Sequence, residues 1–202
     1  MSDVLRPLRF VLIDRDGTLN ELVRGGYVTT VESLRLLDGA LDAIRLLHEA
    51  GLRVGIVTNQ SCIGRGLVSA DTVAYIHAHL VGEILAHGGL VQAIYCCPHS
   101  PADGCDCRKP APGLILRAMH AAGVEPGETV VVGDAPSDRE AARRAGTRYI
   151  QVHTGYGADQ PRASDRQHAG VGRHAVDSSN DSETVGVSSI REAAVWILAQ
   201  RT

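Results

Sequence analysis

Four side chains that bind metals well stand close together in the stretch CCPHSPADGCDCRKP, residues 96–110. Cys97 and His99 form one pair, Cys105 and Cys107 form a second pair, and five residues separate the two pairs. Two short chelating arms joined by a small loop can close a tetrahedral Cys3His site, which suits structural Zn²⁺. The stretch has few apolar residues to fold around, so a bound metal would supply its order. The alternatives are disulfide bonds or a polar loop whose cysteines are incidental.

The neighbouring Cys96 is predicted to have a different role. It ends an apolar run, residues 90–96, that reads as a β-strand. Because side chains alternate along a strand, Cys96 points away from Cys97 and is expected in the core.

A second group of residues with chemical potential follows four apolar runs that predict strands. The members are carboxylates, hydroxyl and amide side chains, and two cations: Asp14, Asp16, Thr58, Asn59, Gln60, Ser61, Arg108, Lys109, Asp134 and Asp138. Each of these features alone also fits an ordinary turn or helix cap. Ligands of open parallel sheets bind outside the carboxyl ends of the strands, so we expect these side chains to meet at one edge.

The chemistry that this group fits is phosphoryl transfer. A carboxylate can attack phosphorus and form an aspartyl-phosphate. Several acids beside a phosphate repel one another, so a divalent cation is required, and oxygen ligands suit Mg²⁺. A lysine and a hydroxyl can stabilise the oxygens of the transferring group, and an acid two residues beyond the nucleophile can protonate the leaving oxygen.

The elements that must position these residues alternate along the chain. Apolar runs at 9–13, 52–60, 90–96, 128–134 and 147–155 predict strands, and residues 40–51, 69–89, 110–123 and 136–146 have helical patterns. This alternation predicts an α/β fold, a Rossmann-like, doubly wound parallel sheet with helices on both faces. Residues 155–187 are polar and aperiodic, which predicts a flexible surface loop, and a C-terminal helix is expected at about 188–200.

Composition limits the remaining possibilities. The chain has 202 residues, so one domain over 1–202 is expected, and its net charge is −3 with 44% hydrophobic and only 3% aromatic residues. A slightly negative net charge does not indicate binding to nucleic acid or to an anionic membrane. The sequence shows neither a signal peptide nor a run long enough to cross a bilayer. We expect a cytoplasmic, monomeric protein, where structural disulfides are rare.

Together the motifs DRDGT, TN, a downstream lysine and GDxxxD resemble those of the haloacid dehalogenase superfamily of phosphatases. The stretches TNQSCIGRG, CPHSPADGCDCRKPAPG and GGYV resemble, more narrowly, the heptose 1,7-bisphosphate 7-phosphatases, with histidinol-phosphate phosphatases as close relatives. The resemblance covers roughly residues 9–155. It implies a capless enzyme in which the zinc loop, 97–107, does part of the work of a cap.

The resemblance also implies a role for each matching residue. Asp14 would be the nucleophile, and Asp16 the general acid and base whose backbone carbonyl also binds Mg²⁺. Asp14 and Asp134 would supply carboxylate ligands to Mg²⁺, and Thr58 and Lys109 would bind the transferring phosphate. The zinc ligands would be those named above. The residues expected to bind the rest of a small sugar-phosphate substrate are Arg24, Gly26, Tyr27, Asn59, Gln60, Ser61 and Arg108.

The sequence departs from the family pattern at three places. Ala135 stands where relatives often have a lysine or arginine, Cys62 stands where they commonly have glycine, and the segment 20–27 is slightly longer, with Arg24 as a substitute donor. The favoured function is removal of the 7-phosphate from D-glycero-D-manno-heptose 1,7-bisphosphate. Other small sugar phosphates, histidinol phosphate and a non-catalytic, zinc-stabilised binding protein are the alternatives.

Overall fold

The computed structural model describes residues 7–159 and 185–200 of the chain. It contains six strands, β1 Phe10–Ile13, β2 Arg53–Asn59, β3 Ala93–Cys97, β4 Thr129–Gly133, β5 Arg148–Val152 and β6 Val185–Val187. The helices are α1 Ala40–Glu49, α2 Ser61–Gly64, α3 Ala70–Ala86, α4 Gly113–Ala122, α5 Pro136–Ala145 and α6 Ile190–Ala199. Short 3-10 turns occupy Pro101–Asp103 (η1), Pro126–Glu128 (η2) and Gly155–Asp159 (η3).

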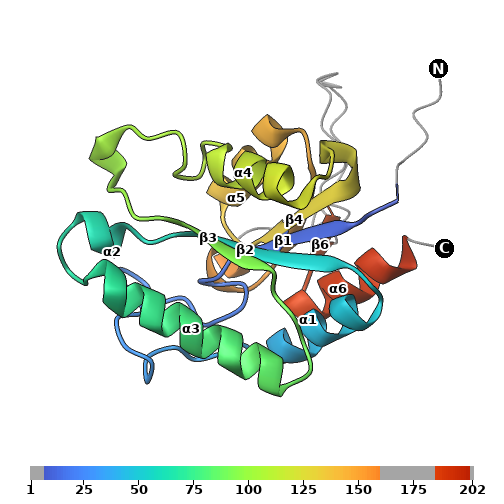
Figure 1. Cartoon of the computed structure of the whole chain (residues 1–202), viewed down its shortest axis with the longest axis horizontal. Helices are drawn as coiled ribbons and strands as arrows, with labels where there is room; N and C mark the ends of the chain where they lie inside the picture. The colour runs from blue at the N-terminus through green and yellow to red at the C-terminus, as the bar shows by residue number, and fades with distance from the viewer. Residues whose placement is uncertain (1–6, 160–184, 201–202) are drawn as a thin grey trace, which may run out of the picture.

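The six strands form one sheet in the order β3-β2-β1-β4-β5-β6, and every neighbouring pair is parallel. Helices cover both faces, with α4 and α5 on one side and α1, α3 and α6 on the other (Figure 1). The predicted doubly wound α/β fold is therefore confirmed. Strands buried on both faces explain why their sequences are continuous apolar runs rather than alternating ones.

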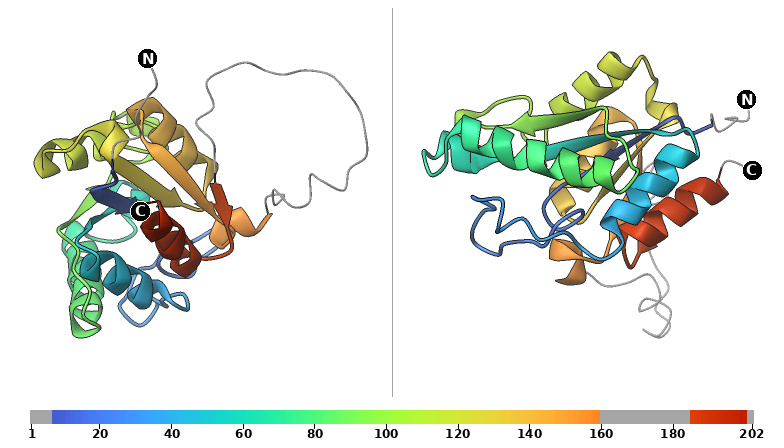
Figure 2. Two further views of the ribbon diagram at one scale, coloured as in Figure 1. Left: turned by 90° about the vertical axis from the view of Figure 1, so that its right-hand side faces the viewer. Right: turned by 60° about the horizontal axis from the view of Figure 1, so that its bottom comes forward.

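Two apolar clusters hold these layers together. The larger includes Val11, Ile13 and Ile56 of the sheet with Ile44 of α1 and Ile197 of α6. Helices α1 and α6 lie side by side on this face (Figure 2). On the opposite face, α4 and α5 pack on the other side of the same strands. Since β1 lies between β2 and β4, the chain connections diverge at its carboxyl end, where a cleft is expected in this fold.

Helix termini follow local rules of the sequence. The side chain of Ser69 accepts a hydrogen bond from the amide of Thr72 and so begins α3. Ser189 begins α6 in the same way, through the amide of Glu192. None of the described helices has the length and apolar character needed to cross a membrane.

The predicted flexible loop at 155–187 is wrong at both of its ends. Residues Gly155–Asp159 form η3, and Val185–Val187 form the sixth strand, which pairs with β5. The interior of that loop lies outside the described residues. The short helix α2 was not expected, and Cys96 is half-buried rather than a full core residue. The C-terminal helix, α6, falls within the predicted range.

No further domain is inserted in the connections that the structure describes. The segment between β1 and α1, residues 14–39, instead runs across the carboxyl edge of the sheet as an extended strap with an isolated bridge between Asn20 and Leu36. The cleft beneath it thus has one wall made by the strap and another made by the loops after β2 and β3.

Candidate active site

A cleft of about 540 Å³ opens at the carboxyl ends of β1, β2 and β4. Its walls come from the first strand end, the strap, α2, the loop after β3 and the start of α5. The lining residues that the sequence predicted are Asp14, Asp16, Gly26, Tyr27, Thr58, Asn59, Ser61, Arg108 and Lys109. Residues far apart in the chain are therefore brought to one site, as the sheet topology requires.

Lys109 lies at the floor of the cleft between two carboxylates. Its Nζ is 2.6 Å from Oδ1 of Asp14 and 2.6 Å from Oδ1 of Asp138, and it also donates to the carbonyl of Val57 at 2.9 Å. The side chain of Lys109 is 3% exposed. Burial alone lowers the pKa of Lys109, but Asp138 and Asp14 outweigh burial and raise it, so the ammonium stays charged.

The carboxylate of Asp134 lies next to this pair and is fully buried. Thr18 donates to its Oδ1 at 3.2 Å, and the backbone amide of Tyr156 donates to its Oδ2 at 2.7 Å. Gly17, with a φ of 92°, approaches so closely that a Cβ there would overlap the carboxylate. Asp134 is thus held in one place by two separate segments of the chain, residues 17–18 and the η3 turn.

These acids carry more negative charge than the protein neutralises. Carboxylate oxygens of Asp14, Asp134 and Asp138 all lie within 4.8 Å of one another, with one lysine between two of them. Burial raises the pKa of Asp14 well above its ordinary value, against the opposing effect of Lys109. Burial, followed by the charge of Asp138, raises the pKa of Asp134 to about 6. A buried cluster of oxygen ligands with this excess charge fits Mg²⁺.

Both carboxylate oxygens of Asp138 are engaged within the protein, as are both oxygens of Asp134. One oxygen of Asp138 is paired with Lys109, and the other accepts a hydrogen bond from the amide of Ala135 at 3.0 Å, at the start of α5. Asp14, Asp134 and Asp138 are all close enough to share one ion, and the choice of Asp14 and Asp134 as its carboxylate ligands stays a prediction. The side chain of Asp138 also anchors the lysine.

The carboxylate of Asp16 faces the cleft but is tied to its surroundings through both oxygens. Arg15 donates to Oδ1 at 2.9 Å and Asn20 donates to the same atom at 3.0 Å. The amide of Gln60 donates to Oδ2 at 2.8 Å. The side chain is 23% exposed, so it is held firmly yet remains open to a ligand in the cleft.

The polar residues after β2 divide between lining the cleft and supporting it. The side chain of Asn59 holds the backbone of Lys109, donating to its carbonyl at 3.0 Å and accepting from its amide at 3.1 Å. Gln60 is fully buried and does not line the cleft, because it donates to Asp16 and to Oγ1 of Thr58. Since Thr58 accepts that bond, its own hydroxyl hydrogen is left to donate toward the cleft.

The strap residues also differ in what they contact. Tyr27 lines the cleft, and its hydroxyl is 3.0 Å from Oγ of Ser61, which ties the strap to α2. Arg24 does not line the cleft. Its guanidinium pairs with Asp159 at 2.8 Å and lies over the ring of Tyr156. Arg24 therefore ties the strap to η3, and its role in substrate binding stays a prediction.

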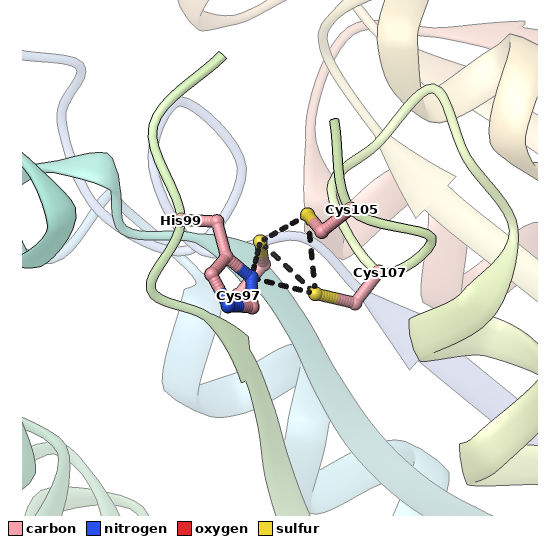
Figure 3. Close-up of side chains that lie close together, drawn as sticks. All are labelled: Cys97, His99, Cys105 and Cys107. Carbon is pink, nitrogen blue, oxygen red and sulfur yellow. Dashed lines mark hydrogen bonds between the residues drawn. The ribbon is translucent and has the colours of Figure 1, made fainter. Parts of the chain in front are cut away.

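The predicted zinc ligands come together in one cluster with no protein group between them (Figure 3). The Sγ–Sγ distances are 3.3 Å for Cys97–Cys107, 3.5 Å for Cys105–Cys107 and 3.7 Å for Cys97–Cys105. Nδ1 of His99 lies 3.2 Å from the Cys107 sulfur and 3.6 Å from that of Cys97. A tetrahedron with Zn–S of about 2.3 Å and Zn–N of about 2.0 Å has edges of roughly 3.5–3.8 Å, so the four ligands fit Zn²⁺.

Disulfides do not fit this arrangement, because an S–S bond is about 2.05 Å long and all five cysteines are free.

The Cys3His cluster is also connected to the active site by hydrogen bonds. Arg108 donates to the carbonyl of His99 at 3.5 Å, and the amide of Gln60 donates to the carbonyl of Cys97 at 2.8 Å. The position of the loop and the position of the cleft residues are therefore linked.

Known proteins are similar to this chain in both sequence and fold. Residues 106–178 match the family model Hydrolase_like, described as HAD-hyrolase-like. A D-glycero-beta-D-manno-heptose-1,7-bisphosphate 7-phosphatase of Pseudomonas putida is 40% identical over 153 residues, 74% of this chain and 85% of the relative. The chain belongs to the heptose-bisphosphate phosphatase family of the haloacid dehalogenase superfamily. It is a phosphoric monoester hydrolase, as the motifs predicted.

Two further family members bear on the site. The D-glycero-alpha-D-manno-heptose-1,7-bisphosphate 7-phosphatase of Mycobacterium bovis is 39% identical over 133 residues, 65% of this chain and 70% of the relative. The crystal structure of the D,D-heptose 1,7-bisphosphate phosphatase of B. bronchiseptica, complexed with magnesium and phosphate, has a TM-score of 0.81 at 30% identity. The superposition includes 96% of this chain and 99% of the B. bronchiseptica chain. Both anomers thus occur among relatives of similar identity.

The sequence analysis of this chain does not predict several residues that line or support its cleft. Asp138 was noted only as an acid near a strand end, although the spacing GDxxxD contains it. Tyr156 and Arg65 also line the cleft, and so does Ser137 beside Ala135. No local pattern marks Tyr156, because it reaches the site through the η3 turn. Cys62 is buried and donates weakly to Gln60 at 3.7 Å, so it supports the floor rather than facing the cleft.

Proposed function

We propose that this chain is a Mg²⁺-dependent phosphatase that removes the 7-phosphate of D-glycero-D-manno-heptose 1,7-bisphosphate through an aspartyl-phosphate on Asp14. The observation that carries the proposal is the bridge made by Lys109 between Asp14 and Asp138 at the cleft floor. A buried, permanently charged lysine beside a carboxylate is suited to bind a phosphate and to aim a nucleophile at it. The substrate named in the relatives supplies the chemical identity of the sugar.

In the first step a carboxylate oxygen of Asp14 attacks phosphorus, and the bond from phosphorus to the sugar oxygen breaks. Lys109 and the hydroxyl of Thr58 donate to the oxygens of the transferring phosphoryl group. Asp16 gives its proton to the departing sugar oxygen, which is too basic to leave as a free alkoxide. The products of this step are the sugar alcohol and an acyl phosphate on Asp14.

In the second step Asp16, now ionised, takes a proton from a water molecule that attacks the phosphorus of the acyl phosphate. The phosphorus–carboxylate bond breaks, inorganic phosphate leaves and Asp14 returns as a carboxylate. Asp14 and Asp134, with the backbone carbonyl of Asp16, are the residues proposed to hold Mg²⁺. When bound, this ion neutralises the charge that the acids and the phosphate share.

The Cys3His cluster is proposed to hold a structural Zn²⁺. Its four ligands leave no open coordination position, and its sulfurs belong to the loop rather than to the cleft lining. The metal would fix the chain immediately before Arg108 and Lys109. Arg108, half-buried at the cleft wall, is proposed to bind the part of the sugar phosphate that does not react.

A phosphate-release panel tests the proposal. The purified protein is assayed with Mg²⁺ against both anomers of heptose 1,7-bisphosphate, histidinol phosphate and fructose 1,6-bisphosphate. We expect one heptose bisphosphate to give the highest kcat/KM and phosphorus NMR to show loss of the 7-phosphate. The cleft lining of the described chain has no carboxylate beyond Asp14, Asp16 and Asp138 to receive an imidazolium, which disfavours histidinol phosphate.

A higher kcat/KM for histidinol phosphate would overturn the proposed substrate, and release from position 1 would overturn the proposed regiochemistry. The cytosolic, monomeric state without nucleic-acid or membrane partners also stays a prediction. Sedimentation of the purified protein at micromolar concentration tests the monomer.

A further inference from the structure

Behind the proposed acid–base residue lies a buried arginine. The side chain of Arg15 is 1% exposed, which makes it one of the largest fully buried side chains in the described chain. A guanidinium has only donors and remains charged in proteins, so burial requires that acceptors surround it. Arg15 stands between Asp14 and Asp16 in the sequence, yet its side chain does not line the cleft.

The guanidinium has two described partners, at opposite ends. Nη2 donates to Oδ1 of Asp16 at 2.9 Å, and Nη1 lies 2.9 Å from Nε2 of His77 on α3. Its Nε has no partner in the described part of the chain. Because arginine can only donate, Nε2 of His77 must accept, which places the imidazole hydrogen on Nδ1. Burial, followed by the charge of Arg15, lowers the pKa of His77 to about 4, so this acceptor is present at neutral pH.

The other titratable groups near Arg15 do not compete for its charge. Cys62 and Cys96 lie close enough to feel the guanidinium, and burial raises the pKa of both thiols, that of Cys96 to about 11. Both are therefore neutral. Asp16 is the one carboxyl group with which the described contacts pair Arg15, and His77 is the neutral group that fixes its other end.

We propose that His77 is a positioning residue for the reaction, holding Arg15 so that Arg15 holds the carboxylate of Asp16 toward the cleft. This inference rests on the proposed acid–base role of Asp16. Without the imidazole acceptor, Nε and Nη1 of the guanidinium would both lack a partner among the described residues. The group would then turn toward other acceptors and draw the Asp16 carboxylate with it, since the two are joined by a short charged bond.

The test uses the purified enzyme with Mg²⁺ and three variants on the same helix. His77→Leu removes the acceptor, and His77→Gln restores one through an amide oxygen. His79→Leu is the matched control, since His79 lies two residues further along α3 and is exposed. Two substrates are compared in single turnover: heptose 1,7-bisphosphate, whose sugar oxygen must be protonated to leave, and 4-nitrophenyl phosphate, whose phenolate leaves without a proton.

We expect His77→Leu to slow transfer from the heptose bisphosphate roughly tenfold to a hundredfold, because a small misplacement of an acid costs that much. In a parallel steady-state assay of the heptose bisphosphate, KM should change less than kcat. Release of nitrophenolate in the first turnover should stay within about twofold of wild type, because Asp16 gives no proton in that step. His77→Gln should recover most of the lost rate, and His79→Leu should match wild type.

A loss of the same size with both substrates would overturn the proposal, because it would indicate general damage to the site. Equal rates for His77→Leu and wild type would also overturn it. Asp16→Asn is measured beside these variants. If Asp16→Asn keeps the wild-type rate on the heptose bisphosphate, the proposed role of Asp16 fails. If Asp16→Asn is inactive while His77→Leu is unchanged, the positioning role of His77 alone fails.

Discussion

Removing the positive charge of Lys109 should lower the melting temperature of the metal-free protein and increase the stabilisation that Mg²⁺ provides. The substitution is Lys109→Met, which keeps an unbranched chain of similar length. In the structure the ammonium is 2.6 Å from carboxylates of both Asp14 and Asp138, and those side chains are 10% and 2% exposed. Without it, three acids whose oxygens lie within 4.8 Å of one another face no ammonium.

The size of the effect follows from burial. Removing one partner of a buried ion pair costs about 3–5 kcal/mol, and a proton taken up by one of the acids brings the cost toward the lower figure. For a domain of this size each kcal/mol shifts the melting temperature by about 2–4 °C. We therefore expect the melting temperature of Lys109→Met to fall by roughly 10 °C in buffer without Mg²⁺.

The same charge argument predicts that Mg²⁺ rescues the variant. A more negative site binds a dication more tightly, and binding to the folded state stabilises it by mass action. Titrating Mg²⁺ during thermal unfolding should therefore raise the melting temperature of Lys109→Met more than that of wild type. Turnover should nevertheless stay very low, because the phosphate loses its lysine contact.

Arg108→Met is the control. Arg108 is the preceding residue, and its described hydrogen bond goes to the carbonyl of His99 rather than to an acid. Loss of this hydrogen bond should cost no more than about 1 kcal/mol of stability. The melting temperature of Arg108→Met should therefore fall by no more than about 2–4 °C. If Lys109→Met is as stable as Arg108→Met without Mg²⁺, or if Mg²⁺ stabilises it less than wild type, the assignment of charge at the cleft floor is refuted.

Four further substitutions test other parts of the site. Asp14→Asn should keep its fold, by circular dichroism, and lose turnover, and more than a few per cent of native activity would reject it as the nucleophile. Cys105→Ser should lower the zinc content from about one per chain by elemental analysis and reduce kcat/KM by on the order of a hundredfold, because Arg108 and Lys109 follow the loop; unchanged kinetics would remove the link between loop and cleft. Arg24→Ala should leave KM within about twofold, since the described contacts of Arg24 are an exposed pair with η3, whereas a large rise in KM would support the sequence prediction that Arg24 binds substrate. Gly17→Ala should weaken Mg²⁺ binding and activity because its Cβ would displace the neighbouring carboxylate, while Gly51→Ala, with a similar positive φ and open space around it, should cost only about 1–2 kcal/mol of stability.

The parts of the fold that the sequence predicted well are those set by local patterns. Continuous apolar strands and helical spacing locate five of the six strands and the longer helices. The ligands Cys97, His99, Cys105 and Cys107 are recognisable because a chelating site made within one loop depends on short spacings alone. The acids at the strand ends converge because parallel strands share one carboxyl edge.

The features that escaped prediction depend on contacts between distant segments. Strand β6 has three residues, and its pairing with β5 cannot be read from its own composition. The amide of Tyr156 reaches Asp134 through a turn within a polar, aperiodic stretch. Asn59 and Gln60 are adjacent polar residues, and only the backbone geometry decides that Asn59 lines the cleft while Gln60 is buried beneath it. The pairing of Arg24 with Asp159 on η3 also joins distant segments and has no local signal in the sequence.

The position of the zinc loop has an energetic reason. The site needs a buried lysine from the connection after β3, but residues 97–107 contribute little apolar surface beyond the metal ligands. Fixing the backbone of one residue costs about 1–2 kcal/mol, so ordering these eleven residues costs on the order of 11–22 kcal/mol. Structural zinc in small peptide sites contributes about 10–16 kcal/mol, which is of the size required. A metal at Cys97, His99, Cys105 and Cys107 would thus let a polar connection deliver Lys109 to the cleft floor without a core of its own.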